Sequence, residues 1–370
     1  MALLLLLSST VGWSADFDKG YEAFLKKDYG TALREWVPLA EQGDAQAQFN
    51  LGTMYDDGKG VSRNNKAAMK WYILAAEQGF ARAQLNLGWM YYKGEGVLQD
   101  YKTAVKWYRL AAEQGHAKTQ FNLGTMYDDG KGVSQNHKTA VKWYTLAAEQ
   151  GFAHAQLNLG WMYSDGKGVS RNHKTAMKWY TLAAEQGDAQ AQLNLGEMYS
   201  DGEGVSQNHK TAVKWYILAA EQGFARAQLN LGWMYYEGEG VLQDYKTAVK
   251  WYRLAAEQGH AKAQFNLGTM YDDGKGVSRN HKTAVKWYTL AAEQGDVDAQ
   301  FNLGVMYYKG EGVPKNFVYA HMWFNIAASQ GNKKAVESRD LVAKEMTSSQ
   351  IEKAQELAAE CEKKKYKGCN

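Results

Sequence analysis

The feature that most constrains this chain is a glycine that recurs at a strict period. The glycines stand 36 residues apart, at positions 43, 79, 115, 151, 187, 223, 259, 295 and 331. Residues 43–330 therefore hold eight full units of equal length. Self-similarity at a period of about 20–50 residues is the signature of a repeat architecture, because a single unit cannot bury its own apolar face. The period therefore excludes one ordinary hydrophobic core for most of the chain.

Each unit contains two helical patterns separated by a break rich in glycine. In the first unit, Ala45, Phe49 and Leu51 recur at helical spacing, and Gly58-Lys59-Gly60 ends the pattern. A second pattern follows over residues 68–75, and an Asn or Asp precedes it in every unit. These residues are suited to cap the start of a helix: Asn64, Asp100, Asn136, Asn172, Asn208, Asp244, Asn280 and Asn316. The sequence thus predicts an all-α fold, a right-handed superhelical α-solenoid of stacked antiparallel helix pairs.

The segments outside the eight repeats predict a leader and two capping regions. Residues 1–15 have the apolar run and small-residue cleavage region of a secretory signal, although no Lys or Arg precedes the run. Residues 16–42 predict a shorter helix pair with a turn at Asp28-Tyr29-Gly30. Residues 331–370 predict two capping helices and a tail, and Thr347-Ser348-Ser349-Gln350 has the pattern of a capping box. We therefore expect a periplasmic or secreted protein, with a cytoplasmic location as the alternative.

The two cysteines agree with export. Cys361 and Cys369 are separated by eight positions, and Gly368 lets the chain fold back between them. In an oxidising compartment we expect them to form a small disulfide that fixes the C-terminal tail. The CxxC spacing of a redox or zinc site is not present in the sequence.

The repeated string itself carries a resemblance to a known family. Ala-Glu-Gln-Gly-x-Ala-x-Ala-Gln-x-Asn-Leu-Gly-x-Met-Tyr-x-x-Gly-x-Gly-Val, followed by Ala-x-Lys-Trp-Tyr, resembles the Sel-1-like repeat, a relative of the tetratricopeptide repeat. The resemblance extends over all eight units and is closest to exported bacterial members. It implies an α-solenoid that holds protein partners together without catalysis or cofactors. It also implies that the first helices line a concave groove in which partners bind.

Three positions in each unit vary where packing does not dictate the residue. They are the positions of Gln46, Thr53 and Asp56, which helical spacing puts on one face of the first helix. Three tryptophans lie 72 residues apart at the second position, where other units carry Thr, Glu or Val. Exposed aromatic residues and Arg are typical of interface hot spots. We therefore predict that protein or peptide partners bind to Arg82, Trp89, Tyr92, Lys118, His154, Trp161, Glu197, Arg226, Trp233, Tyr236, Lys262 and Tyr308.

One block of two repeats has been copied within the chain. Residues 80–151 and 224–295 differ at only three of 72 positions, which are Lys93/Glu237, Thr119/Ala263 and Gln135/Arg279. Matching surface residues in the two blocks are therefore not independent evidence for one ligand.

Two other functions remain open at this stage. A cell-wall glycan binder would use the same aromatic platforms. A β-lactamase-like hydrolase, suggested by cysteine-rich relatives, would use the Ser-x-x-Lys of Ser164 and Lys167, but its Ser-Asp-Asn and Lys-Thr-Gly partners are missing. The resemblance implies no enzyme, and we expect none.

Charge and histidine placement narrow the range of partners. The formal net charge of +3 gives no basic footprint for nucleic acid, and no apolar run is long enough for a stable membrane span. Four histidines share one position at the start of the second helix, where Tyr101, Tyr245 and Phe317 also occur: His137, His173, His209 and His281. That exchange predicts stacking between repeats, and we expect no metal site.

Overall fold

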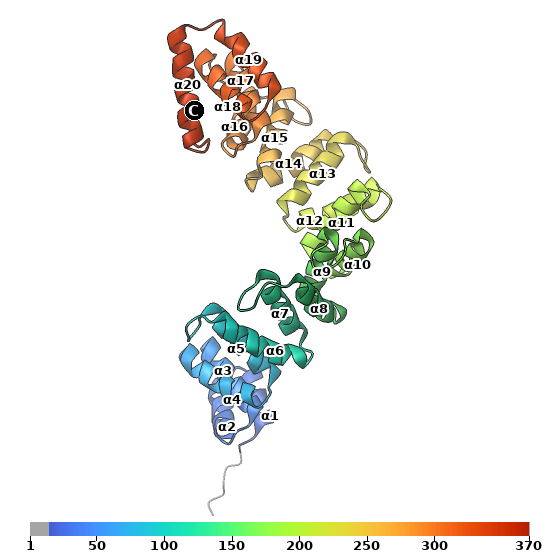
Figure 1. The fold of residues 1–370 in the computed structure, drawn as a ribbon, viewed down its shortest axis with the longest axis vertical. Coiled ribbons are helices and arrows are strands. Elements are labelled where there is room, and N and C mark those ends of the chain that lie inside the picture. The colour runs from blue at the N-terminus through green and yellow to red at the C-terminus, as the bar shows by residue number, and fades with distance from the viewer. Residues whose placement is uncertain (1–14, 370) are drawn as a thin grey trace, which may run out of the picture. The chain divides into compact units, whose positions relative to one another are not determined.

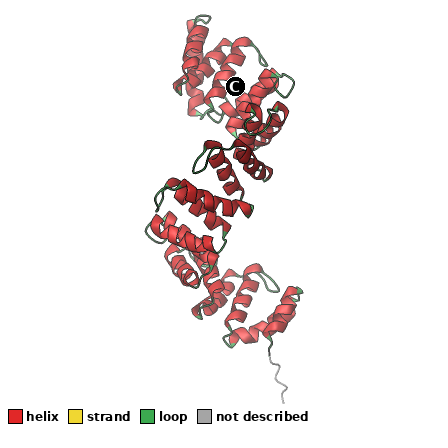
Figure 2. Cartoon of the chain, turned by 90° about the vertical axis from the view of Figure 1, so that its right-hand side faces the viewer, coloured by secondary structure: helices red, strands yellow, loops and turns green. Residues whose placement is uncertain are grey.

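A computed structural model of the chain describes residues 15–369, which form twenty helices and no strand (Figure 2). It divides into two compact units, Met1–Leu182 and Ala183–Asn370, whose boundary falls inside one helix. The expected leader lies outside the described residues except for Ala15. None of the described helices is both long and apolar enough to cross a membrane.

The helices follow one another in pairs along each unit (Figure 1). The first unit contains α1 (Phe17–Leu25), α2 (Tyr29–Glu41), α3 (Ala45–Asp57), α4 (Asn65–Glu77), α5 (Ala81–Lys93), α6 (Tyr101–Glu113), α7 (Ala117–Asp129), α8 (His137–Glu149), α9 (Ala153–Asp165) and most of α10 (His173–Glu185). The second contains α11 (Ala189–Asp201), α12 (His209–Glu221), α13 (Ala225–Glu237), α14 (Tyr245–Glu257), α15 (Ala261–Asp273), α16 (His281–Ala292), α17 (Val297–Lys309), α18 (Phe317–Ser329), α19 (Lys333–Ala343) and α20 (Ser348–Lys363). The predicted all-α class and helix pairs are confirmed.

Hydrogen bonds at the helix ends show why the pairs form and how they run. The predicted Asn and Asp caps accept backbone N–H groups, as Asn64 does from Ala67 at 3.1 Å. At the other end of α4, the Gln78 side chain donates to the Gly43 carbonyl at 2.9 Å, just before α3 begins. Because the end of α4 lies beside the start of α3, the two helices of the repeat are antiparallel.

A glycine in each first helix lets the second helix approach closely. A Cβ added at Gly124 of α7 would lie only 2.7 Å from the ring of Tyr144 of α8. Tyr144 is fully buried at this contact, and burial raises its pKa to about 12. The ring therefore fills the space that the missing side chain leaves, and the pair packs as a unit.

A buried glutamine then joins each repeat to the next. Gln228 of α13 donates from its amide to the Ala220 carbonyl at the end of α12, at 3.1 Å. Its amide oxygen accepts from Gln258, at the end of α14, at 2.8 Å. One side chain thus connects three helices, and the same bonds recur at Gln48, Gln84, Gln120, Gln192, Gln264 and Gln300.

The described segments on either side of the repeats also begin their helices at capping residues. The expected turn at Asp28-Tyr29-Gly30 is wrong: Asp28 caps α2, which already begins at Tyr29, because the Asp28 carboxylate accepts the Thr31 N–H at 3.1 Å. At the C-terminus the capping box of Thr347 and Gln350 opens α20. A disulfide joins Cys361 of α20 to Cys369 in the tail.

Candidate functional site

The predicted groove residues lie on the first helices of the repeats, α5, α7, α9, α11, α13, α15 and α17. We call the side chains at the positions of Gln46, Thr53 and Asp56 in each repeat the first-helix face. Its three tryptophans are exposed despite their size: Trp89 at 45%, Trp161 at 38% and Trp233 at 41%. At the framework position of the second helices, Trp323 is fully buried and the other seven tryptophans are partly buried. Packing within the chain therefore leaves a part of each of these three indole rings exposed to solvent.

In the second unit, Trp233 stands between two neighbouring clefts. One cleft of about 290 Å³ lies between α11 and α13 and is lined by Glu197, Ser200, Asp201, Tyr216, Arg226, Asn230, Trp233 and Met234. The other, of about 230 Å³, lies between α13 and α15 and is lined by Trp233, Tyr236, Glu237, Tyr252, Phe265, Asn266, Thr269 and Met270. The first cleft is mostly polar, whereas the second is mostly apolar and has four aromatic side chains in its lining, so we call it the aromatic cleft. A ligand that spans both would therefore meet the indole ring at its centre.

The polar cleft contains an ion pair between two of the predicted residues. The Arg226 Nε lies 2.8 Å from a carboxylate oxygen of Glu197, and Asn230 donates to the same oxygen at 3.4 Å. Burial raises the pKa of Glu197, and the charge of Arg226 opposes that rise. Arg226 remains 65% exposed, so its guanidinium has further donors for a bound anion.

The three tryptophans differ in what covers their rings. The Lys93 ammonium lies 4.8 Å from the Trp89 ring centre, and the Lys167 ammonium lies 3.9 Å from that of Trp161. The copied block has Glu237 where the first has Lys93, and Glu237 lines the aromatic cleft beside Trp233. Tyr92 stacks on Trp89 at 6.0 Å.

The cations of the two copied blocks also differ in their partners. In the second unit, Arg226 pairs with Glu197, and Lys262 pairs with Asp298 at 2.9 Å. Their copies Arg82 and Lys118 form no ion pair among the described residues. The positions equivalent to Glu197 and Asp298 hold Thr53 and His154 there. Both unpaired cations help to lower the pKa of nearby His116, after the larger effect of its burial. The first block thus presents positive charge that, in the second block, is neutralised by carboxylates of the flanking repeats.

The hydrolase alternative receives no support from side-chain geometry. No hydrogen bond joins Ser164 to Lys167 in the part of the chain that the structure describes, and Lys167 instead lies over Trp161. The histidines at the start of the second helices were expected to stack between repeats, but His137 and His281 make a different contact. Each forms a hydrogen bond to an aspartate of its own repeat, Asp128 or Asp272, at 2.7 Å.

Sequence reasoning missed the cleft residues that also belong to the repeat framework. Asn230, Phe265 and Asn266 are in the Asn-Leu-Gly region of the repeat string, and a search restricted to variable positions discards them. Their helical spacing from Arg226 and Lys262 is the signal that could have included them.

Comparison with known proteins agrees with the repeat geometry. The family described as Sel1 repeat matches residues 45–80, 81–116, 117–152, 153–188, 189–224, 225–260, 261–296 and 297–332. A Sel1 repeat protein from Oxalobacter formigenes is 38% identical with a TM-score of 0.65, over 85% of this chain and 92% of that one. The structure of c5321, a protective antigen of uropathogenic Escherichia coli, is 32% identical with a TM-score of 0.58, over 91% and 96%. No curated protein matched the sequence significantly.

Proposed function

Because this chain belongs to the Sel1 repeat family, we propose that it is a non-catalytic scaffold whose first-helix face binds protein or peptide partners. The observation that carries the proposal is the exposed Trp233 between two adjoining clefts, with Arg226 beside it. A large aromatic side chain with neighbouring Arg and Tyr is the composition of an interface hot spot.

The contacts around the clefts support a partner with both apolar and acidic groups. An apolar side chain fits the aromatic cleft formed by Tyr236, Tyr252 and Phe265. In the first unit, Trp89 and the unpaired Arg82 and Lys118 favour a partner that carries carboxylates. The binding face is built from helices, so its residues are held in place before the partner arrives.

We further propose that the protein acts outside the cytoplasm. The sequence begins with a leader-like segment, and the Cys361–Cys369 disulfide is a bond that persists in oxidising compartments. The related c5321 is described as a protective antigen, which agrees with exposure to the outside.

Affinity capture from a periplasmic extract tests the proposal with three forms of the full chain. These are the wild type, Trp233→Ala and the control Leu254→Ala, which removes a side chain of similar exposure, 38%, from the second helix α14. Circular dichroism establishes that all three are folded. For a captured protein, titration calorimetry should show a Kd about 30-fold weaker with Trp233→Ala, the effect of losing a hot spot of about 2 kcal/mol.

The wild type and Leu254→Ala should bind this protein equally. Equal affinity of all three forms would refute the first-helix face as the binding site. Binding to purified wall fragments, with no captured protein, would favour the glycan alternative instead.

A further inference from the structure

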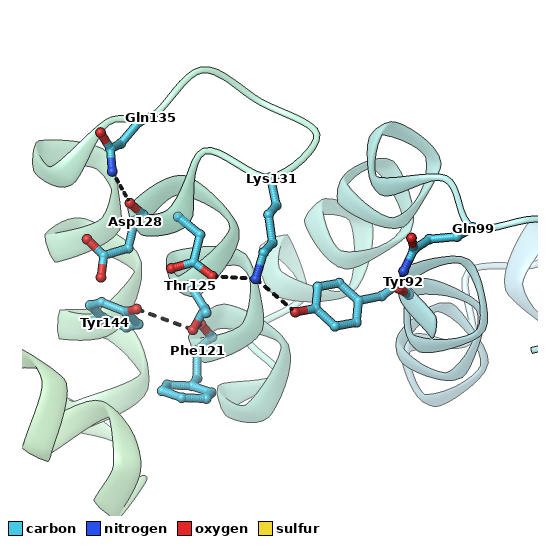
Figure 3. Close-up of polar contacts among 9 residues, drawn as sticks. Tyr92, Gln99, Phe121, Thr125, Asp128, Lys131, Gln135 and Tyr144 are labelled. Atoms are coloured by element: carbon cyan, nitrogen blue, oxygen red, sulfur yellow. Dashed lines mark hydrogen bonds and ion pairs between the residues drawn. The ribbon is translucent and has the colours of Figure 1, made fainter. Parts of the chain in front are cut away.

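Three positions of each repeat pair meet where one repeat contacts the next. The first is near the end of the first helix, the second opens the second helix, and the third precedes the second loop glycine of the following repeat. In one junction these are Tyr92, Tyr101 and Lys131: the rings of Tyr92 and Tyr101 lie 5.3 Å apart, and the Lys131 ammonium donates to the Tyr92 hydroxyl at 3.3 Å. Figure 3 shows Lys131 reaching from its loop to Tyr92 of the preceding repeat.

Backbone packing explains why the third residue arrives at this place in the junctions within each unit. Gly312 has φ +73°, and a Cβ there would overlap the carbonyl oxygen of His281 at the start of α16. Gly276 and Gly168 approach the backbones of Tyr245 and His137 in the same way. The glycine fixes the loop against the preceding repeat, so the residue before it must lie beside the first two positions.

At the junction of α15, α16 and the loop after α17, these positions hold Asp272, His281 and Glu311. The His281 Nδ1 lies 2.7 Å from an Asp272 carboxylate oxygen. One candidate ligand atom from each residue lies within 4.8 Å of the others, and all three side chains are partly buried. Within residues 15–369 this is the one group of three His, Cys, Asp or Glu side chains with that geometry.

We propose that Asp272, His281 and Glu311 bind a divalent transition metal ion of the Zn²⁺ type. One imidazole and two carboxylates are ligands that such ions accept, and three protein ligands leave a fourth position for water or a partner group. The spacing across two repeats also fits, because small side-chain movements bring 4.8 Å to the separation of ligands around one ion. The Lys309 ammonium, 3.6 Å from Glu311, would be displaced by the ion.

Sequence reasoning does not find this site because the third ligand belongs to another repeat. Glu311 lies 30 positions after His281, beyond the compact spacings of familiar metal motifs. The signal is the combination of Asp, His nine positions later and Glu a further 30 positions on, read across the repeat boundary.

Four other sets of residues at the same spacing each lack one ligand: Asp56/Asn65/Glu95, Asp128/His137/Lys167, Ser164/His173/Glu203 and Ser200/His209/Glu239. Two of these sets show which contact remains. At one, Asp128 and His137 are 2.7 Å apart, but Lys167 takes the place of the glutamate. At the other, the His209 Nδ1 lies 3.4 Å from Glu239, but Ser200 takes the place of the aspartate. These natural variants show which substitutions the junction accepts without changing its backbone.

The experiment is titration of the untagged full chain with Zn²⁺, by calorimetry and by equilibrium dialysis with metal analysis. We expect one tight equivalent for the wild type and none for Glu311→Lys, which copies the residue found at Lys167. The reverse change, Lys167→Glu, should raise the stoichiometry to two. Co²⁺ added to the wild type should give a visible absorption band that Glu311→Lys lacks.

Circular dichroism of each variant ensures that a lost site is not a lost fold. The absence of a stoichiometric site in the folded wild type would overturn the proposal. Unchanged binding by folded Glu311→Lys would overturn it too, because the ion would then be held by other histidines.

Discussion

The buried glutamine of each repeat predicts a stability change that depends on pH. Gln228 is only 4% exposed, and its amide nitrogen donates to the Ala220 carbonyl while its oxygen accepts from Gln258. Gln228→Glu preserves the shape of the side chain but replaces the donor by an oxygen. At neutral pH a carboxylate then faces a carbonyl oxygen in a site shielded from water.

The size of the effect follows from the contacts that change. The hydrogen bond to Ala220 is lost and a buried charge is created, which together cost about 3 kcal/mol of the free energy of unfolding. Because one pKa unit corresponds to about 1.36 kcal/mol, the introduced carboxyl should have a pKa about two units above that of an ordinary Glu. The folded state then holds this proton more tightly than the unfolded chain. The stability lost at pH 7.5 should therefore return as pH falls from about 6.5 to about 4.5.

Urea denaturation, followed by circular dichroism, measures the difference between Gln228→Glu and the wild type at several pH values. Each repeat contacts only its neighbours, so hydrogen exchange of amides in α12, α13 and α14 should report the same loss locally. Gln258→Glu is the matched control, since that side chain is exposed and can turn to water, and it should cost less than about 1 kcal/mol. A loss at Gln228 that does not change with pH would refute the role of its amide as a donor.

Three further changes test other contacts of the repeats. Ala263→Thr should raise the free energy of unfolding by about 1 kcal/mol in urea denaturation. The His260 Nδ1 is buried without a hydrogen-bond partner, whereas in the other copied block Thr119 forms a hydrogen bond with the equivalent His116. An unchanged free energy of unfolding would contradict this reasoning. Gly312→Ala should lower the free energy of unfolding by about 2 kcal/mol, because φ of Gly312 is positive and a Cβ would overlap the His281 carbonyl oxygen. An unchanged urea midpoint would show that the loop can move to accommodate the Cβ. Burial and nearby cations lower the pKa of His116, so the unfolded chain binds its proton more readily and stability should fall as pH drops below about 6.5. His116→Phe introduces a residue that three other repeats carry at this position, and it should lose less stability between pH 7.5 and 5 than the wild type. Equal losses would assign the effect to other groups.

The sequence predicted features that depend on contacts within one repeat. The caps follow from Asn or Asp before an apolar pattern, and the exposure of Trp89 follows from its place on the face opposite the packing residues. The prediction failed at the start of α2. Gly30 suggested a turn over residues 28–30, but Asp28 caps a helix that already begins at Tyr29.

Contacts between repeats were harder to predict because the residues that touch are not separated by the 36-residue period. Arg226 pairs with Glu197, which is 29 positions earlier, and Glu311 reaches His281, which is 30 positions earlier. The two residues of each pair therefore occupy different positions of the 36-residue repeat, and a comparison of equivalent positions does not bring them together. Which positions of neighbouring repeats come into contact is determined by how one repeat packs on the next.

This dependence on neighbours gives the copied blocks different surfaces although their residues are nearly the same. Arg82 and Arg226 are equivalent, yet the repeat before the second block supplies Glu197 and that before the first supplies Thr53. At the other end, Asp298 pairs with Lys262, whereas Lys118 has no such carboxylate. A repeat at the edge of a copied block thus changes the charge of the block without any substitution inside it. Because charge complementarity governs which partners approach, duplication alone can give one chain two binding surfaces with different preferences.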